Sequence, residues 1–267
     1  MRERKLVEAE KKNIQQKITK WDLFKVFFAS FFMQAVWNFR SLISIGFSIC
    51  FLPIVGKLCK TPQAKREFFE RHLKFFNAHP YFASFALGIS IRIEEMRSKG
   101  ELDSLPNVDR LKDLLIGPLG AVGDQLFWAT IKPASLLFGM LGIILSPTVT
   151  IKIIVLVLTF LIYNIPHFYY RYEGIVEGYH HATDIYKYIG QQRFEIIIRW
   201  YSYVFAISLF SLIFIYSYQL SQENPLLILV LLIAALYTYL LNRFSTNFYL
   251  VTFASFIFFL VVGILFF

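Results

Sequence analysis

Amide, indole and imidazole side chains occur in short polar groups within an otherwise apolar chain. In the segment "MQAVWNFR", Gln34, Trp37 and Asn38 are spaced i, i+3, i+4, so on a helix they share one face. An indole can stack on the apolar face of a sugar ring while amides donate to and accept from its hydroxyls. The same three residues would equally serve as polar contacts between packed helices, which composition alone favours.

A second polar group stands in the segment "FFNAHPYF". Here Asn77 and His79 directly precede a proline. A neutral imidazole at this place could hydrogen-bond a ligand hydroxyl, or it could be a packed side chain whose hydrogen bonds are satisfied within the protein. Together the two segments predict a substrate site made of Gln34, Trp37, Asn38, Asn77 and His79.

The segment "IGPLGAVGDQLFWATIKP" (116–133) combines helix-breaking residues with two charges. Its Gly-Pro pair and later glycine predict a break in a membrane helix, a feature that points to substrate sites in transporters because the freed backbone lines a cavity. Asp124 would cap the helix that follows. Lys132, two turns later on the same side, would pair with Asp124 or extend to the membrane interface. The predicted broken-helix motif comprises Gly117, Pro118, Gly123, Asp124, Trp128, Lys132 and Pro133.

Composition sets the environment of these groups. The chain has 267 residues, 57% hydrophobic and 18% aromatic, whereas soluble domains have about 45–50% apolar residues. Segments 201–220, 224–242 and 244–267 approach the roughly 20 residues that a bilayer span needs, and segments 133–151 and 153–170 are nearly as long. We therefore predict an all-α integral membrane protein. Broken or re-entrant helices are expected in its N-terminal half and plain transmembrane helices in its C-terminal half.

The net charge of +9 is distributed in a way that favours a membrane over nucleic acid as partner. Lysine and arginine collect in segments 2–25, 57–74, 92–112 and 171–199, and short basic loops stay cytoplasmic. The loop 221–224 has no basic residue, and Arg243 is the one charge between the last two spans. We expect a cytoplasmic N-terminus and an extracytoplasmic C-terminus. Cys50 and Cys59 support neither a disulfide framework nor a zinc site.

Four regions follow along the chain. Residues 1–30 predict an amphipathic helix, with Ile14, Ile18, Trp21 and Phe24 or Phe28 at helical spacing, which lies in the membrane interface or packs on a partner subunit. Residues 31–150 form the predicted broken-helix, substrate-handling region, and its segments 41–56 and 75–91 are short and interrupted by glycine and proline. Residues 151–199 are a span and a basic cytoplasmic segment. Residues 200–267 are the C-terminal transmembrane helices.

One segment carries side chains that bind metals in other proteins. In "EGYHHATD", Glu177, His181 and Asp184 could share a helix face, but their spacing matches no standard metal motif. The sequence also has no nucleophile elbow, phosphate-binding loop or paired catalytic carboxylates. We predict no catalytic residue, no metal and no cofactor.

Several of these patterns occur together in one protein family. The segments "WNF" and "IGF" (37–47), "RHLKFFNAHPYF" (71–82), "GISIRIEEMR" (88–97) and "GPLGAVGDQLFWATIKP" (117–133) stand in the family's order. The chain resembles the IID membrane subunit of mannose/fructose/sorbose-type phosphoenolpyruvate-dependent sugar phosphotransferase systems. The resemblance extends over about 18–189, with "YRYEGIVEGYHHATDI" (170–185) as a weaker continuation.

The resemblance implies a role within a larger assembly. A IID subunit pairs with a IIC subunit, and an oligomer of such pairs conducts a hexose inward across the bacterial plasma membrane in an elevator-like movement of broken helices. A IIB domain phosphorylates the sugar with phosphate received from IIA. The phosphorylated histidines belong to those soluble partners, so His79 and His180 are not expected to carry phosphate.

The chain departs from the family pattern at positions near the presumed sugar. Arg40, Ser41 and Leu42 replace Glu, Arg and Met, Ala78 replaces Thr, Gln125 replaces Pro and Ala129 replaces Gly. Lost hydrogen-bonding partners change discrimination between substrates. Either the substrate differs from mannose, or the chain is a non-transporting membrane interaction or regulatory protein that retains the scaffold. A membrane-embedded metalloenzyme using His180 and His181 ranks third.

Overall fold

The computed structural model describes residues 17–101, 108–185, 189 and 191–223, together with residues 232–233, 235–237, 239–240, 243, 253–258 and 260–261. The chain divides into two compact units, Met1–Ala206 and Ile207–Phe267. The predicted spans at 224–242 and 244–267 fall mostly outside the described residues, as does Ile14. Every side chain discussed below lies in the first unit.

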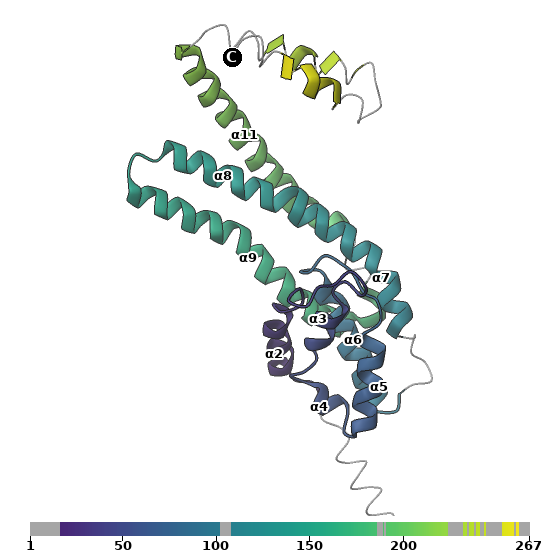
Figure 1. Ribbon diagram of the computed structural model, residues 1–267. Coiled ribbons are helices and arrows are strands. Elements are labelled where there is room, and N and C mark those ends of the chain that lie inside the picture. The colour runs from purple at the N-terminus through teal and green to yellow at the C-terminus, as the bar shows by residue number, and fades with distance from the viewer. Residues whose placement is uncertain are drawn as a thin grey trace, which may run out of the picture. The chain divides into compact units, whose positions relative to one another are not determined.

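The described residues form helices and turns, with two isolated β-bridges but no β-strand (Figure 1). The all-α prediction is therefore confirmed. In chain order the helices are α2 (Lys20–Ser30), α3 (Ser44–Ile49), α4 (Val55–Leu58), α5 (Pro62–His72), α6 (Ala83–Ser98), α7 (Val108–Gly123), the π-helix η1 (Asp124–Ile131), α8 (Lys132–Leu145), α9 (Val149–His181), the 3₁₀ turns η2 (Ala182–Asp184) and η3 (Gln191–Phe194), and α11 (Glu195–Glu223).

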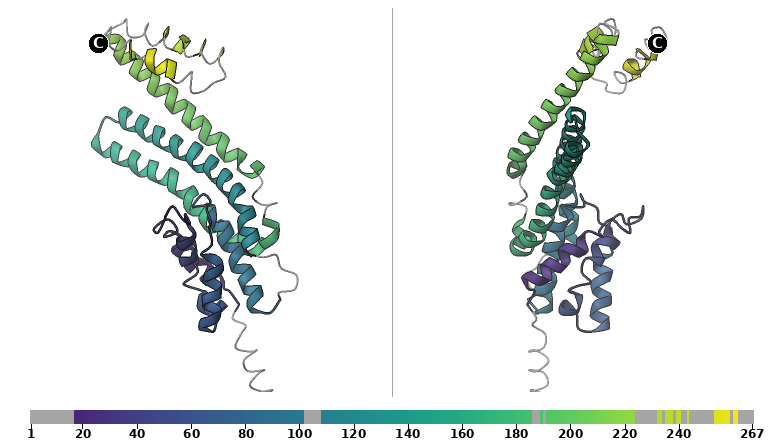
Figure 2. Two further views of the ribbon diagram at one scale, coloured as in Figure 1. Left: turned by 45° about the vertical axis from the view of Figure 1, so that its right-hand side comes forward. Right: turned by 90° about the vertical axis from the view of Figure 1, so that its left-hand side faces the viewer.

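Among the described residues, three helices are long and apolar enough to cross a membrane: Arg110–Leu145, Val149–His181 and Glu195–Leu220. The first is α7, η1 and α8 read as one continuous helix. Its α8 part and the first half of α9 lie side by side as a hairpin (Figures 1 and 2). The turn between them is at 146–148, where the Thr148 hydroxyl caps α9 by accepting from the Ile151 N–H at 3.3 Å. A proline-containing turn therefore divides the two arms, and the apolar segments 133–151 and 153–170 do not coincide with α8 and α9.

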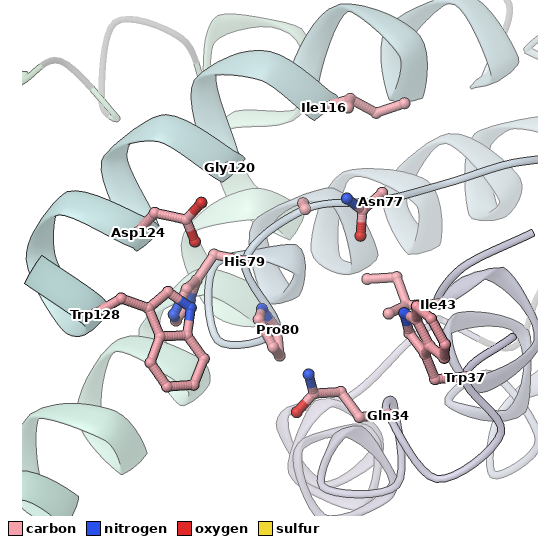
Figure 3. Close-up of a pocket in the computed structure, with 11 residues that line it drawn as sticks. Gln34, Trp37, Ile43, Asn77, His79, Pro80, Ile116, Gly120, Asp124 and Trp128 are labelled. Carbon is pink, nitrogen blue, oxygen red and sulfur yellow. The ribbon is translucent and has the colours of Figure 1, made fainter. Parts of the chain in front are cut away.

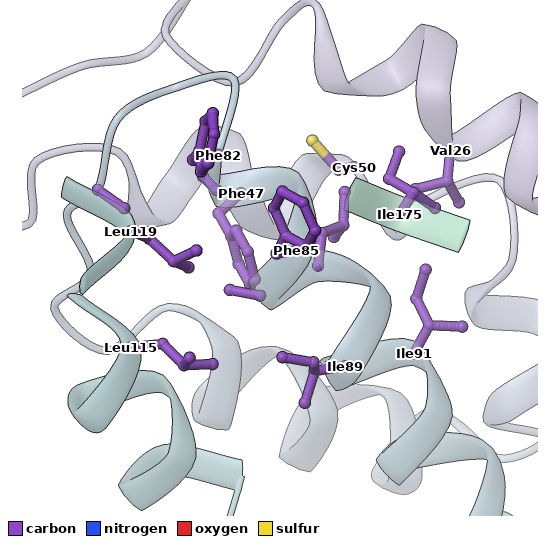
Figure 4. Packing of buried hydrophobic residues seen from close by; sticks show 14 of the residues in the cluster. Val26, Phe47, Cys50, Phe82, Phe85, Ile89, Ile91, Leu115, Leu119 and Ile175 are labelled. Carbon is purple, nitrogen blue, oxygen red and sulfur yellow. The ribbon is translucent and has the colours of Figure 1, made fainter. Parts of the chain in front are cut away.

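Small residues bring α6 and α9 into backbone contact. A Cβ added at Gly88 would lie 2.2 Å from the Ile175 carbonyl oxygen, and one at Gly178 would lie 2.3 Å from the Phe85 carbonyl oxygen. Gly174 and Gly178 are one turn apart on α9, the small-xxx-small spacing that lets membrane helices approach closely. Because α6 is enclosed in this way, nearly all of its first three turns is buried (Figure 4).

The helix α2 buries one face in the protein and leaves the predicted aromatic face exposed. Thr19 and Asp22 form a capping box at its start, and Leu23 and Val26 face the core. The aromatic side of α2 is the exposed one, since Trp21 is 62% exposed. The contact of this aromatic side with lipid or with a partner subunit remains a prediction.

The segment 116–133 is not interrupted, which corrects the predicted break. Pro118 lies inside α7, and the helix continues through Gly123 into η1 and α8. What changes is the hydrogen bonding, since the N–H of Lys132 donates to the carbonyl of Phe127, five residues earlier. Asp124 is therefore not an N-cap, because the helix has already begun at Val108.

The predicted interruption of segment 41–56 is observed. The helices α3 and α4 contain 6 and 4 residues and are separated by turns at 50–54. Re-entrance of this segment into a bilayer remains a prediction.

Candidate functional site

A cavity of about 230 Å³ lies where three segments of the first unit meet. They are the turns after α2, the extended segment before α6, and the helix α7–η1 (Figure 3). Of the five predicted substrate residues, four line this cavity. Two members of the predicted helix motif also line it, so the polar and aromatic lining consists of Gln34, Trp37, Asn77, His79, Asp124 and Trp128.

Backbone pairing holds the segment that carries Asn77 and His79. The N–H of Ile43 donates to the carbonyl of Phe76 at 3.2 Å, which fixes this strand-like segment against the residues leading into α3. The carbonyl of His79 then accepts from the N–H of Ala83 at 2.8 Å, which starts α6. Asn77 and His79 are therefore held at both ends by main-chain bonds.

His79 is the most constrained polar group of the cavity. Its ring is 3% exposed and stacks on Phe127 with centroids 5.3 Å apart and planes at 14°. Nδ1 accepts from the N–H of Tyr81 at 3.3 Å, which leaves the proton of the neutral ring on Nε2. Burial, together with the nearby Arg171, lowers the pKa of His79 from 6.5 to about 3, so the ring is neutral at physiological pH.

The Nε2 of His79 has no hydrogen-bond partner among the described residues. A buried polar group left unsatisfied is costly, and most such groups in proteins have a partner. A neutral N–H donor in a cavity wall is therefore suited to a ligand hydroxyl or carbonyl. This observation favours the ligand-binding role of His79 over the packing role.

Gly123 explains how the helix approaches this ring. A Cβ at Gly123 would lie 2.3 Å from the Cβ of His79. The glycine predicted to break the helix instead lets the helix pass directly over the histidine. Its position also brings the next residue, Asp124, to the cavity.

Asp124 is an acceptor without a partner among the described residues. No ion pair joins it to Lys132, and the Lys132 Nζ lies 4.4 Å from the centroid of the Trp128 ring instead. The predicted pairing of the two charges is therefore wrong, since the cation packs on the indole between them. An ionised carboxylate only accepts hydrogen bonds, so Asp124 complements the donor on His79.

Two indoles face the cavity from different segments. Trp37 is 47% exposed and packs edge-on against Phe39, with ring centroids 4.7 Å apart. Trp128 is 42% exposed and meets the His79 ring edge-on at 5.4 Å. Each indole thus keeps open surface at the cavity on which a sugar ring could stack.

Asn38, the fifth predicted residue, does not line the cavity. Its Oδ1 accepts from the N–H groups of Arg40 and Ser41 at 3.0 and 2.9 Å, and its Nδ2 donates to the Ser41 hydroxyl at 3.0 Å. Asn38 is therefore the side chain that folds a turn. The predicted helical face is wrong because residues 31–36 form turns after α2 ends.

Sequence reasoning missed a buried cation near His79. Arg171 of α9 is 4% exposed and donates to the backbone carbonyl and the hydroxyl of Ser30 at the end of α2. Its Nε donates to His167 at 3.1 Å, and its guanidinium lies 5.1 Å from the Tyr81 ring centroid. A cation at the C-terminal end of a helix is favourable, and here it links α9 to the end of α2. The only signal in the sequence was one arginine at the end of an apolar span.

The "GISIRIEEMR" segment supplies two buried carboxylates near the C-terminal end of α6, away from the cavity at its start. Glu94 pairs with Arg71 at 2.9 Å. Glu95 accepts from Lys99 at 3.0 Å and from the N–H of Ile18 at 3.2 Å. Burial raises the pKa of both glutamates, but contacts with His72 and Arg71 at Glu94, and with Tyr179, Lys99 and Ile18 at Glu95, outweigh it and the net shift is downward.

The histidines near the end of α9 do not form a metal site with their neighbours. His181 Nε2 lies 3.2 Å from Glu177 Oε2. Within the described part of the chain, no three candidate ligands converge in a way that could hold a metal ion.

Comparison with known proteins identifies the family to which this architecture belongs. Residues 17–213 match the family described as the PTS system mannose/fructose/sorbose family IID component. The mannose-specific EIID component of Escherichia coli (strain K12) is 32% identical over 191 residues, covering 69% of this chain and 64% of that protein. The fructose permease IID component of Bacillus subtilis (strain 168) is 27% identical over 187 residues, covering 68% and 64%. The chain thus spans less than two thirds of the length of these relatives.

Solved structures extend the similarity to nearly the whole chain. A chain in the cryo-EM structure of the mannose transporter ManYZ in complex with microcin E492 aligns with a TM-score of 0.57 at 26% identity, covering 94% of this chain and 96% of that one. A structure described as a membrane protein aligns with a TM-score of 0.66 at 25% identity, covering 93% and 96%. With these structural neighbours and three membrane-length apolar helices in the described part of the chain, the protein is an integral membrane protein. It belongs to the IID components of the mannose/fructose/sorbose family of phosphotransferase systems.

Proposed function

We propose that this chain is the IID subunit of a sugar-transporting phosphotransferase system and that it forms, with a IIC subunit, the pathway by which a hexose enters a bacterial cell. Soluble IIA and IIB proteins would couple this entry to phosphorylation of the sugar. The names of the relatives, which are specific for mannose, sorbose or fructose, support a sugar as the substrate.

The observation that carries the proposal is the convergence of sugar-binding groups on one cavity. His79 offers a neutral N–H donor, Asp124 a carboxylate acceptor and Asn77 an amide that does both. Trp37 and Trp128 offer ring faces for the apolar side of a sugar. The volume of about 230 Å³ is below the roughly 300–1,000 Å³ of pockets for drug-sized ligands and suits a monosaccharide.

The departures from the family pattern leave most of this lining intact. Arg40 and Gln125 lie outside the cavity lining, so the inverted charge at position 40 does not face the presumed sugar. Ala78 does line the cavity, and the hydroxyl it lacks favours a substrate other than mannose. This pattern supports altered specificity over loss of transport.

We place the protein in the bacterial plasma membrane with a cytoplasmic N-terminus and an extracytoplasmic C-terminus, in an oligomer of IIC–IID pairs. The basic segment between α9 and α11 supports a cytoplasmic position for that connection. The hairpin turn at 146–148 and the end of α11 would then lie on the opposite side.

Uptake of labelled hexoses tests the proposal. The chain and its companion IIC-like subunit are expressed with working IIA and IIB proteins in cells without a mannose-type system of their own. Wild type, Asn77→Ala and Asp124→Asn are compared at equal membrane levels, with Arg40→Ala as the control outside the cavity. We expect one hexose to be taken up, both cavity variants to abolish that uptake, and the control to retain it. If a stable complex takes up no sugar, the chain is a non-transporting member of the family.

A further inference from the structure

Lys132 is a charged residue placed deep within a membrane helix. It opens α8, which has 14 residues and is thus about 20 Å long at 1.5 Å per residue. If the hairpin turn lies at one membrane surface, Lys132 is about 10 Å inside the opposite boundary of a roughly 30 Å hydrocarbon core. Charged side chains at such positions usually have a partner or a function.

A groove of about 220 Å³ between α8 and α9 begins at this lysine. Its walls include Leu136 and Phe160, and it also contains the polar side chains of Ser135, Thr159, Tyr163 and Asn164.

The other polar groups of the groove are already hydrogen-bonded within the chain. The Ser135 hydroxyl donates to the Ile131 carbonyl at 2.7 Å and the Thr159 hydroxyl donates to the Val155 carbonyl at 2.8 Å. The Asn164 amide donates to the carbonyl of Phe160, and the Tyr163 hydroxyl pairs with that of Tyr81. The groove therefore offers one charge between apolar walls. A sugar, which needs several donors and acceptors, does not suit it.

Lys132 is an exposed residue, and no carboxylate among the described residues pairs with it. The ammonium packs on the Trp128 ring face, 4.4 Å from the centroid. A cation–π contact compensates a charge only in part, so the position calls for an anion. Lipid phosphates lie at the membrane surface, beyond the depth of this lysine, whereas a carboxylate on a neighbouring span can reach it.

We infer that the groove between α8 and α9 receives a span of the companion membrane subunit and that an aspartate or glutamate on that span pairs with Lys132. The inference rests on the proposed IIC partner. The pair would hold Lys132 against Trp128, whose other contacts are with the cavity. Docking of the companion would thereby set the orientation of a ring that lines the sugar site.

Membrane-permeant carbodiimide provides the direct test, because it joins an amine to a carboxylate only where the two are in contact. The co-expressed complex is treated with dicyclohexylcarbodiimide, digested and analysed by mass spectrometry. We expect an amide bond between Lys132 and one acidic residue of the companion. Lys132→Arg should lose the cross-link and keep the complex, since the guanidinium still pairs but does not form this amide.

Retention of the companion on the tagged chain supplies the second measurement. Lys132→Met should reduce retention at least tenfold, and the same substitution at Lys152, in the first turn of α9, is the matched control. Lys132→Asp should be rescued by lysine at the cross-linked acid of the companion. The thermal melting of each purified variant shows whether it is folded.

Each outcome decides the inference. Full retention and uptake in Lys132→Met would show that the lysine only extends toward the interface. Full retention with lost uptake would make Lys132 a contact of the sugar. A phospholipid bound to the chain alone and lost in Lys132→Met would make lipid the occupant. All three would overturn the inference. If wild type transports no hexose but retention still depends on Lys132, the proposed function fails and the inference holds.

Discussion

Gly178→Ala tests the helix contact on which the cavity depends. The new Cβ would lie 2.3 Å from the Phe85 carbonyl oxygen, whereas an ordinary contact of this kind begins near 3.4 Å. The helices α6 and α9 would therefore have to separate by about 1 Å. Alanine gains about 1 kcal/mol over glycine in a helix, while forcing extra atoms into a close-packed site costs about 1–3 kcal/mol and occasionally more. Because the clash is with backbone on one helix and lies within a glycine-lined seam, we expect a net loss of about 2 kcal/mol.

The assay is the free energy of unfolding in mixed micelles, from an SDS titration followed by tryptophan fluorescence. Gly56→Ala is the control, because a Cβ at Gly56 meets nothing within 4 Å and should leave stability equal or slightly higher. Gly178→Ala should also raise the KM for sugar uptake, since α6 begins beside the cavity. A Gly178→Ala chain that is as stable as Gly56→Ala would refute close packing between α6 and α9.

Three further outcomes follow from the polar groups. Because folding lowers the pKa of His79 from 6.5 to about 3, the unfolded chain binds a proton at pH values where the folded ring stays neutral. The free energy of unfolding should therefore fall as the pH drops from about 6.5 towards 3. His79→Gln should flatten this pH dependence in an unfolding titration. Burial raises the pKa of Asp22, but hydrogen bonds to its carboxylate, of which that from Lys57 at 2.6 Å has the largest effect, lower the pKa from 3.8 to about 2. Lys57→Met should therefore cost about 1–2 kcal/mol at neutral pH, and the loss should fade between about pH 4 and 2, where Asp22 becomes protonated. Asn38→Asp should keep uptake, since its carboxylate still accepts the two turn bonds, whereas loss of uptake would give the amide a direct role.

The membrane character and the site segments could be predicted because they depend on local properties of the sequence. Long apolar runs indicate spans, and amides, indoles and an imidazole in short segments indicate ligand chemistry. Four of the five predicted substrate residues, Gln34, Trp37, Asn77 and His79, line one cavity. These residues could be assigned to one site from their chemistry alone, on the assumption that the two segments that carry them lie close together in the fold.

The errors arose where a distant contact decides the role of a residue. Gly123 suggested a helix break, but its function depends on the His79 ring that packs against it from another segment. Asn38 was assigned to a helix face, but the chain turns there and its side chain bonds to the backbone of the turn. The hydrogen bond between Arg171 and Ser30 joins positions 141 residues apart, and no local sequence pattern predicts it.

The π-helical segment Asp124–Ile131 has a consequence for how this membrane helix tolerates insertions and deletions. In an unbroken α-helix each residue advances the side chains by about 100°, so the direction of one end dictates the direction of the other. Wider turns in the middle uncouple the two directions. Asp124 and Trp128 can then face the cavity while Gly139 faces Thr159 of α9. Because a π-helical turn holds about one residue more than an α-helical turn, a one-residue deletion within 124–131 would return the segment to an α-helix with little rotation of α8, whereas the same deletion elsewhere in the helix would rotate α8 by about 100° relative to α7.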